Sequence, residues 1–282
     1  MSRIAVVGDA ALDVLVRAGT LPEPGGDVRA TIGIRPGGAG ANTAAWLAAL
    51  GADPVLIARI GADIAGGQVW DFLAAAGVGT ALVTDGGAPT ATVVVLVDGA
   101  GQRAMLADRG AAGRLAPADI TVPPGTRHLH LSGYVLLDGS SRAAGVAALA
   151  AARAAGLTTS VDPQAAALLT DPAGFLDHVR GVDLLLPSAG ELAALGGADA
   201  ALASVRAVAV TDGPHGAAWL DRAGRVEVPG RTADVVDTTG AGDAFDAGVL
   251  AAWTAGASPA AALAAGVAAG TRAVGIAGAW PF

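Results

Sequence analysis

Short apolar runs alternate along the chain with alanine- and leucine-rich segments of helical length. The runs are bounded by Gly, Pro or Asp, as strands buried on both faces usually are. The predicted strands are Arg3–Gly8, Pro54–Gly61, His128–Gly133, Thr158–Pro163, Val182–Ser188 and Ala207–Gly213. The predicted helices are Asn42–Gly51, Gly67–Gly77, Ser141–Gly156, Ala189–Gly197, Gly242–Gly256 and Ser258–Gly275. Buried strands separated by helices predict an α/β fold with a mostly parallel, doubly wound sheet.

Two segments break this alternation. Val14–Arg35 has no helical pattern, and Pro89–Asp108 reads as a hairpin with its turn around Asp98–Gly101. Both alternate as antiparallel strands do. We expect a small sheet inserted into the α/β domain from about residues 14–35 and 89–108. No repeat, linker or charge block divides the chain, so residues 1–282 are expected to form a single domain.

Composition excludes several kinds of chemistry. The 282 residues include no cysteine, and all 17 basic residues are arginine. A thiol nucleophile, cysteine-ligated zinc, a Schiff-base lysine and the lysine of a Walker P-loop are therefore absent. The net charge of -8 and the lack of a basic run argue against nucleic acid or an anionic membrane as a partner. Neither a membrane span nor a signal peptide is predicted, and we expect a cytoplasmic protein.

The stretch DTTGAGDAF, from Asp237 to Phe245, combines an accessible glycine turn with a carboxylate. Backbone amides of such a turn and the following helix N-terminus attract anions. Asp243 can simply stabilise that helix end. It can also accept a proton from a substrate hydroxyl while the amides and Mg²⁺ stabilise a transferring phosphoryl group.

A second long pattern, RPGGAGANTAAWLAALGADPVLIARIGADIAGG, spans Arg35–Gly67. Together with DTTGAGDAF about 200 residues later, it resembles the ribokinase/PfkB family of carbohydrate kinases over essentially the whole chain. The resemblance implies a ribokinase-like three-layer α/β/α sandwich with a small β-sheet lid. It also implies a phosphotransferase with an alcohol group as acceptor, which transfers the γ-phosphoryl group of ATP to a sugar or nucleoside hydroxyl with Mg²⁺.

The resemblance assigns roles position by position. Asp243 matches the catalytic base, and the residues that match the anion hole are Gly240, Ala241 and Gly242. Those that match the sugar site are Asp13, Gly38 and Asn42. Those that match the nucleotide site are Ser188, Thr211, Gly213 and Gly216, with Ser188 in place of the usual Asn. Glu191 matches the residue that organises Mg²⁺ through water. Asp237 and Thr239 lie where related kinases bind K⁺, and the short C-terminal tail leaves that site in question.

Several other residues have competing interpretations. His128 and His130 share a strand face, and satisfied structural histidines are favoured over a metal pair. For Asp162, formation of a turn before Pro163 and contact with a substrate or phosphate are equally favoured roles. Asp246 is an unusual acid near the phosphate end. Arg103 lies on the inserted hairpin and Arg109 just after it, where a solvated edge competes with contact to a substrate phosphate or carboxylate. Three aromatic residues are expected in the core: Trp46, Trp70 and Phe72.

The acceptor is less well defined than the reaction. Neither inserted segment contains an aromatic residue on which a base could stack, which favours a ribose- or fructose-like sugar. A nucleoside kinase of adenosine or pseudouridine type, and a non-catalytic sugar or nucleotide sensor, remain the alternatives. The apolar hairpin Thr90–Val97 would be an exposed edge in a monomer, so we expect a homodimer formed through the lid.

Overall fold

The computed structural model describes residues 2–20, 22–100 and 103–282. Within them, nine strands form the main sheet in the order β13-β12-β11-β10-β9-β8-β1-β4-β5. Its strands are β1 (Arg3–Val7), β4 (Asp53–Gly61), β5 (Gly79–Asp85), β8 (Thr126–Ser132), β9 (Thr158–Asp162), β10 (Leu184–Leu185), β11 (Ala207–Thr211), β12 (Gly216–Asp221) and β13 (Gly224–Pro229). All pairs are parallel except β11–β12 and β12–β13, which add an antiparallel hairpin at one edge. The predicted mostly parallel sheet is confirmed.

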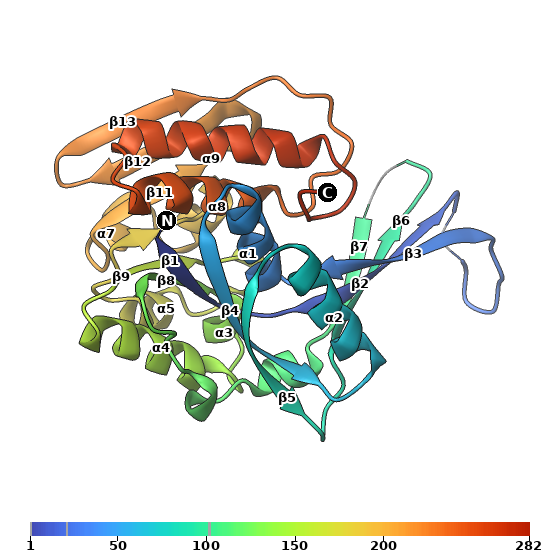
Figure 1. The fold of residues 1–282 in the computed structure, drawn as a ribbon. Helices are drawn as coiled ribbons and strands as arrows, with labels where there is room; N and C mark the ends of the chain where they lie inside the picture. The colour runs from blue at the N-terminus through green and yellow to red at the C-terminus, as the bar shows by residue number, and fades with distance from the viewer. Residues whose placement is uncertain (1, 21, 101–102) are drawn as a thin grey trace.

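Helices cover both faces of this sheet and complete the predicted three-layer sandwich (Figure 1). One face carries α1 (Ala39–Ala49), α2 (Ile64–Ala75), α8 (Ala241–Thr254) and α9 (Pro259–Val274). The other carries α3 (Tyr134–Leu137), α4 (Arg142–Ala154), α5 (Pro172–His178), α6 (Ala189–Ala194) and α7 (Ala198–Leu202). Short 3₁₀ turns lie at Gly110–Arg114, Pro117–Asp119, Ala166–Leu168 and Gly213–His215.

Small residues set how closely the helices approach. A Cβ on Gly248 of α8 would lie 2.6 Å from the carbonyl oxygen of Ala265 in α9, so only glycine permits this crossing. Trp46 is fully buried, as predicted. The prediction that Trp70 is a core residue is wrong, because 44% of its surface is exposed on α2. Its apolar character does not distinguish the inner face, since α2 carries large apolar residues on its outer face as well, where Ile64 is 85% exposed.

Four further strands form a small sheet in the order β3-β2-β6-β7 among the described residues. They are β2 (Ala11–Ala18), β3 (Ala30–Gly37), β6 (Ala91–Val97) and β7 (Arg103–Asp108). The outer pairs are antiparallel as expected, but β2 and β6 pair in parallel. Both strands leave the main sheet from the carboxyl ends of parallel strands, β1 and β5, so they run in the same direction. The expectation that Thr90–Val97 forms an exposed edge is wrong, because β6 lies between β2 and β7. The predicted turn at Asp98–Gly101 lies partly outside the described residues.

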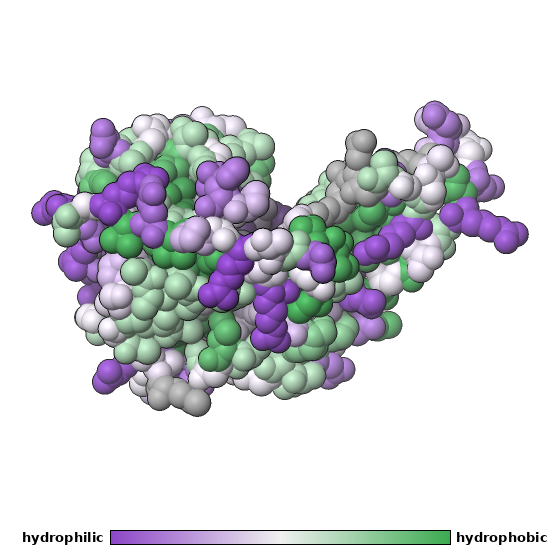
Figure 2. Space-filling view, turned by 90° about the horizontal axis from the view of Figure 1, so that it is seen from above, coloured by the Kyte–Doolittle hydropathy of each residue, from purple (hydrophilic) through white to green (hydrophobic). Residues whose placement is uncertain are grey.

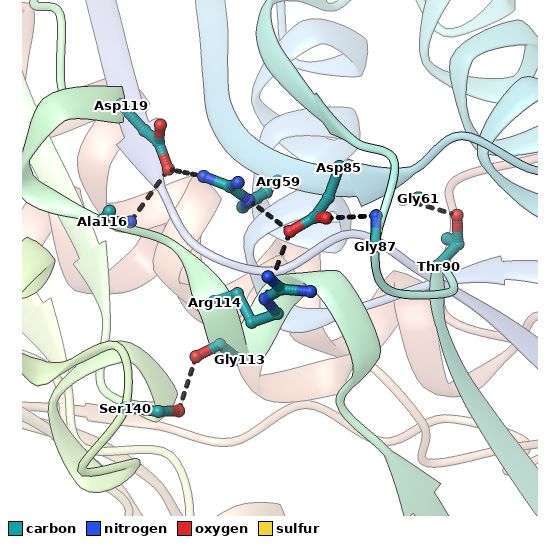
Figure 3. A network of polar contacts seen from close by, with 10 residues as sticks. All are labelled: Arg59, Gly61, Asp85, Gly87, Thr90, Gly113, Arg114, Ala116, Asp119 and Ser140. Carbon is teal, nitrogen blue, oxygen red and sulfur yellow. Dashed lines mark hydrogen bonds and ion pairs between the residues drawn. The ribbon is translucent and has the colours of Figure 1, made fainter.

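An ion-pair network ties the main sheet to the chain that follows the small sheet (Figure 3). The Arg59 guanidinium at the end of β4 contacts Asp85 at 2.9 Å and Asp119 at 2.7 Å. Arg114 contacts the same Asp85 carboxylate at 3.4 Å. Nearby, the Thr90 hydroxyl accepts a hydrogen bond from the Gly61 amide at 2.9 Å, immediately before β6 begins. The root of the small sheet is therefore fixed to the rigid body, while the sheet itself projects from it (Figure 1).

In the part of the chain that the structure describes, no helix combines the length and the apolar character needed to cross a membrane.

Candidate active site

The candidate residues gather at the carboxyl edge of the parallel strands, where α1 and α8 begin. Seen from above, the body and the projecting small sheet are separated by a notch (Figure 2). Ligands of open α/β sheets bind at this edge, since strand-to-helix loops and helix N-termini converge there.

Asp243 lies in the first turn of α8 and is 91% buried, with 9% of its surface exposed. Its Oδ2 accepts a hydrogen bond from the side-chain amide of Asn42 at 2.8 Å. The indole nitrogen of Trp280 donates to the Asn42 Oδ1 at 2.9 Å and so fixes which face of the amide meets Asp243. The two predicted residues, about 200 positions apart in sequence, are thus joined in a rigid polar chain.

The Gly240–Gly242 turn leads directly into this helix. Gly240 is its N-cap residue with φ 73°, in the left-handed region that favours glycine. A Cβ there would lie 2.7 Å from the Cβ of Ala279. No described atom lies within 4 Å of a Cβ built on Gly242, so the turn is open on that side. The amides of Ala241 and Gly242 belong to the first turn of α8, whose amides lack an intrahelical carbonyl partner and carry the positive end of the helix dipole.

Burial and neighbouring acids set the ionisation of the site. Desolvation raises the pKa of Asp243 to about 7, a hydrogen bond from Asn42 opposes it, and the charges of Asp9 and Asp13 add to it. Desolvation and the charge of Asp9 likewise raise the pKa of Asp13 to about 7. Burial, with Asp9 and Asp243 contributing, raises the pKa of Tyr134 to about 12. A carboxyl with a pKa near neutrality is suited to general-base work.

The raised pKa predicts a pH dependence. Asp243 can accept a proton only when ionised, so the kcat/KM of any reaction that uses it should rise with pH and level off above about 7. Because its folded pKa exceeds the usual value of 3.8, its contribution to folding stability is full below that value and is lost as pH rises through about 7. Asp13 titrates in the same range, so the rate profile reports the pair. Initial rates from pH 5.5 to 9 check this; a flat profile would contradict it.

The sugar-site candidates surround the same helix ends. Gly38 caps α1 with φ 90°, and a Cβ there would lie 2.8 Å from the Asp9 carbonyl oxygen. Asp13 on β2 lies against Gly37 of β3 so closely that any side chain at Gly37 would collide with its carboxyl. The lack of side chains at Gly37 and Gly38 therefore leaves room for the Asp13 carboxyl and for the start of α1, which carries Asn42. The predicted sugar contact of the Arg103 side chain lies outside the described side chains.

Ser188 and Glu191 form a capping box at the start of α6. The Ser188 hydroxyl accepts from the Glu191 amide at 3.3 Å, and a Glu191 carboxylate oxygen accepts from the Ser188 amide at 2.7 Å. Serine is among the best N-cap residues, which gives a local reason for its presence where relatives carry Asn. Ser188 also bridges Thr211 at the end of β11, so two nucleotide-site candidates lie side by side.

The remaining nucleotide candidates bracket a 3₁₀ turn. Gly213 and Gly216 have φ of 50° and 110°, and a side chain at Gly216 would collide with the Val228 carbonyl. A groove of about 680 Å³ between α6 and the edge hairpin is lined by Leu192, Gly216 and Val228 among others, and Asp243 is not part of its wall. The groove therefore adjoins the nucleotide candidates. Its walls do not include the buried carboxyls of Asp162, Asp243 and Asp246, which we call the acid cluster.

The cation candidates lie in the loop before α8. The Asp237 carboxylate accepts from the amide and hydroxyl of Thr239 at 2.9 and 2.7 Å, and from the Gly278 amide at 3.1 Å. Asp237 thereby joins the Gly240 turn to the C-terminal segment.

The structure gives the surroundings of the residues with competing interpretations. His128 and His130 are fully buried and hydrogen-bond to Ser160, and burial lowers the pKa of each to about 3. Both ring nitrogens of His128 have partners, whereas the Nε2 of His130 has none. No cluster of three or more metal-ligating side chains occurs in the described residues. Arg109 is not a solvated edge residue, because it ion-pairs with Asp138 at 3.0 Å and lies over the Tyr134 ring at 5.8 Å.

Asp162 and Asp246 both belong to the buried acid cluster. Asp162 forms a turn in which its carboxylate accepts a hydrogen bond from the Gln164 backbone amide at 2.8 Å. Burial, together with the charges of Glu191 and Asp243, raises the pKa of Asp162. Asp246, one helical turn after Asp243, is only 2% exposed. The sequence identified these acids but not Gln164 and Trp280. A lone glutamine after Asp-Pro and a tryptophan near the C-terminus carry no periodic signal; only their hydrogen bonds reveal them.

Comparisons with known proteins agree with this architecture. A sequence profile described as pfkB family carbohydrate kinase matches residues 1–280. An ATP-dependent ribose-1-phosphate kinase of Halopiger xanaduensis is 33% identical over 264 residues, which cover 90% of this chain and 85% of the relative. A fructokinase of Klebsiella pneumoniae is 34% identical over 266 residues, which cover 88% of this chain and 83% of the relative. The crystal structure of adenosine kinase from Sinorhizobium meliloti superposes with a TM-score of 0.88 at 25% identity, covering 100% of this chain and 96% of that one.

Proposed function

Because the chain belongs to the pfkB family of carbohydrate kinases, we propose that it transfers the γ-phosphoryl group of ATP to a hydroxyl of a small, ribose- or fructose-like sugar. The observation that carries the proposal is the buried Asp243 carboxylate, held by Asn42 directly after the Gly240–Gly242 turn. Asp243 would accept the hydroxyl proton, and the amides of the turn would hold the phosphoryl group as its charge develops. Asp13, Gly38 and Asn42 would hold the sugar.

The acidity of the site supports a need for a divalent cation. Asp9, Asp13, Asp162 and Asp243 would all repel ATP phosphates, and Mg²⁺ on the nucleotide offsets this repulsion. Mg²⁺ prefers oxygen ligands and keeps several waters, which fits a water-mediated contact to the Glu191 carboxylate. When bound, the ion would neutralise charge on the phosphates. Ser188, Thr211, Gly213 and Gly216 would line the nucleotide side, and Asp237 and Thr239 are the candidates for K⁺.

The acceptor is tested with an ADP-release assay across fructose, ribose, ribose 1-phosphate, adenosine and pseudouridine. The highest kcat/KM on a sugar would support the proposal. A nucleoside preferred over every sugar would replace it with a nucleoside kinase. Ligand-induced shifts in melting temperature without any ATP consumption would replace it with a sensor. The relatives named as ribose-1-phosphate kinase and fructokinase favour a sugar over a nucleoside.

We also propose a single kinase domain, residues 1–282, whose small sheet acts as the lid and pairs with a second copy. The small sheet exposes large apolar side chains, among them Ile32 at 64% and Met105 at 58%. The projecting part of the molecule carries apolar surface in Figure 2. Light scattering at micromolar concentration should give the mass of a homodimer, and Ile32→Asp with Met105→Asp should give a monomer; a wild-type monomer would contradict the proposal.

A further inference from the structure

The C-terminal segment, Gly278–Phe282, packs against the parts of the chain that form the candidate active site. The Gly278 amide donates to the Asp237 carboxylate at 3.1 Å, in the loop before α8. Ala279 fills the space beside Gly240, where an added Cβ would lie 2.7 Å from the Ala279 Cβ. The end of the chain therefore contacts both this loop and the turn that would hold the phosphoryl group.

Trp280 brings the one polar atom of its ring into this site. The residue is only 4% exposed, and its ring meets the Phe72 and Phe282 rings edge-on with centroids 6.3 and 5.7 Å away. Its indole nitrogen donates to the Oδ1 of Asn42 at 2.9 Å, across 238 positions of the sequence. Phenylalanine could make the same edge contacts but not this hydrogen bond.

The hydrogen bond from Trp280 gives the chain Trp280–Asn42–Asp243 a direction. An indole N–H can only donate, so it requires the carbonyl oxygen of the Asn42 amide. The amide NH₂ is then turned toward Asp243 and donates to its Oδ2 at 2.8 Å. An ionised carboxylate can only accept, so this arrangement matches the charged form of the base. With the amide turned over, its carbonyl would face the carboxyl, and Asp243 would have to be protonated to donate.

We propose that Trp280 is a positioning residue whose N–H keeps the Asn42 amide turned so that its NH₂ donates to the Asp243 carboxylate. The proposal rests on the proposed kinase function. Both hydrogen bonds are buried, and a buried amide oxygen that loses its donor is left without a partner, which is costly. The end of the chain thus controls the orientation of the base through Asn42.

Acids face Asp243 from several elements, and they oppose its ionisation. The C-terminal segment itself is met by a cation, since Arg272 of α9 donates to the Pro281 carbonyl at 3.2 Å. Donation through Asn42 offsets part of the effect of the acids, because it favours the charged form of Asp243. The ionisable groups that interact electrostatically with Asp243 are Asp9 after β1, Asp13 on β2, Tyr134 on α3, Asp162 at the end of β9 and Asp246 on α8.

Trp280→Phe removes the donor and keeps an aromatic ring against Phe72 and Phe282. We expect kcat on the plateau of the pH–rate profile to fall about 10- to 100-fold, because the base is no longer held in place. The KM for ATP should stay within about twofold. The rising limb of the profile should move to higher pH, because the charged form of Asp243 loses a correctly turned donor. Trp280→Ala should have a similar kcat but a lower melting temperature, since it also removes the ring.

A purely structural role of the ring predicts the opposite result. Wild-type kcat and an unmoved pH limb in Trp280→Phe would therefore overturn the proposal. Trp219→Phe is the matched control, because it removes the indole N–H of another buried tryptophan, which donates to Asp221 at 2.9 Å on β12. It should keep the wild-type kcat and pH limb, and a control as slow as Trp280→Phe would count equally against the proposal.

A double variant tests whether Trp280 acts through Asn42. Asn42→Ala combined with Trp280→Phe should be no slower than Asn42→Ala alone, because the second change has no amide left to act on. Losses in kcat that multiply in the double variant would overturn the path through Asn42.

Nuclear magnetic resonance tests the same path without turnover. In the wild type with ¹⁵N-labelled tryptophan, the indole signal of Trp280 is identified by its contacts with the Phe72 and Phe282 rings. It should shift with a midpoint near pH 7, since the pKa of Asp243 is raised to about 7, and should lose this titration in Asp243→Asn. A signal that does not respond to pH would overturn the proposal even in an active enzyme. An inactive wild type with the titration intact would refute the kinase function and support the path to Asp243, which separates the two failures.

Discussion

Replacement of Asp243 by asparagine is expected to lower kcat about 10²- to 10⁴-fold, the range that general-base catalysis usually contributes. Asparagine has the same size, and its carbonyl oxygen can still accept the hydrogen bond from Asn42. It cannot take up the proton of a substrate hydroxyl. Sugar and ATP should therefore still bind, as shown by calorimetry or by ligand-induced melting shifts, while ADP release almost stops.

The control for this variant is Asp199→Asn on α7, which makes the same chemical change away from the acid cluster and should keep the wild-type rate. Removal of a buried carboxylate also removes its desolvation penalty, so above pH 7 the Asp243→Asn protein should be at least as stable as the wild type. A variant that turns over its best substrate at the wild-type rate would show that Asp243 is not the base.

Substitution of Gly240 by alanine should damage both stability and rate. The residue is in the left-handed region, which costs an alanine about 1 kcal/mol. Its Cβ would lie 2.7 Å from the Cβ and 2.8 Å from the Cα of Ala279. Relief of such crowding costs about 1–3 kcal/mol more. The turn must shift to accommodate it, so the amides would no longer meet the phosphoryl group, and we expect kcat to fall by about 100-fold.

Gly242→Ala is the matched comparison. It lies two residues further along the same turn, inside α8, with no atom within 4 Å of the new Cβ. Alanine in a helix is favoured over glycine by about 1 kcal/mol, so its free energy of unfolding should be unchanged or higher. Urea unfolding of both variants separates the two positions. Equal stability of Gly240→Ala and wild type would contradict the proposed close contact with Ala279.

The sequence predicts the layers of this fold because alternation of buried strands and helices is a local, periodic property. The turn at Gly240 and the acid at Asp243 are equally local, and their place at a helix N-terminus follows from adjacent residues. Pairing direction in the small sheet is not local. It depends on β2 and β6 both leaving the same edge of the main sheet, and an alternating pattern alone fits parallel and antiparallel pairing equally.

The electrostatics of the site could not be predicted for a similar reason. Asp162 and Asp246 are 84 positions apart in the sequence, 162 to 246, yet both are buried, and burial together with the charge of Asp162 raises the pKa of Asp246. Trp280 fixes Asn42 from near the end of the chain. Buried pairs of this kind have no spacing rule. Trp70 illustrates the converse: an apolar residue on a helix need not be buried when apolar residues occupy both the inner and the outer face of that helix, as in α2.

We propose that Asp243 activates a sugar hydroxyl for attack on the phosphoryl group held by the Gly240–Gly242 turn. The most direct measurement follows label from [γ-³²P]ATP in the presence of Mg²⁺ and the best sugar of the substrate panel. We expect one labelled sugar phosphate for each ADP formed by the wild type, and almost none from an Asp243→Asn variant that still binds both substrates. Label released only as inorganic phosphate, or equal transfer by both proteins, would contradict it.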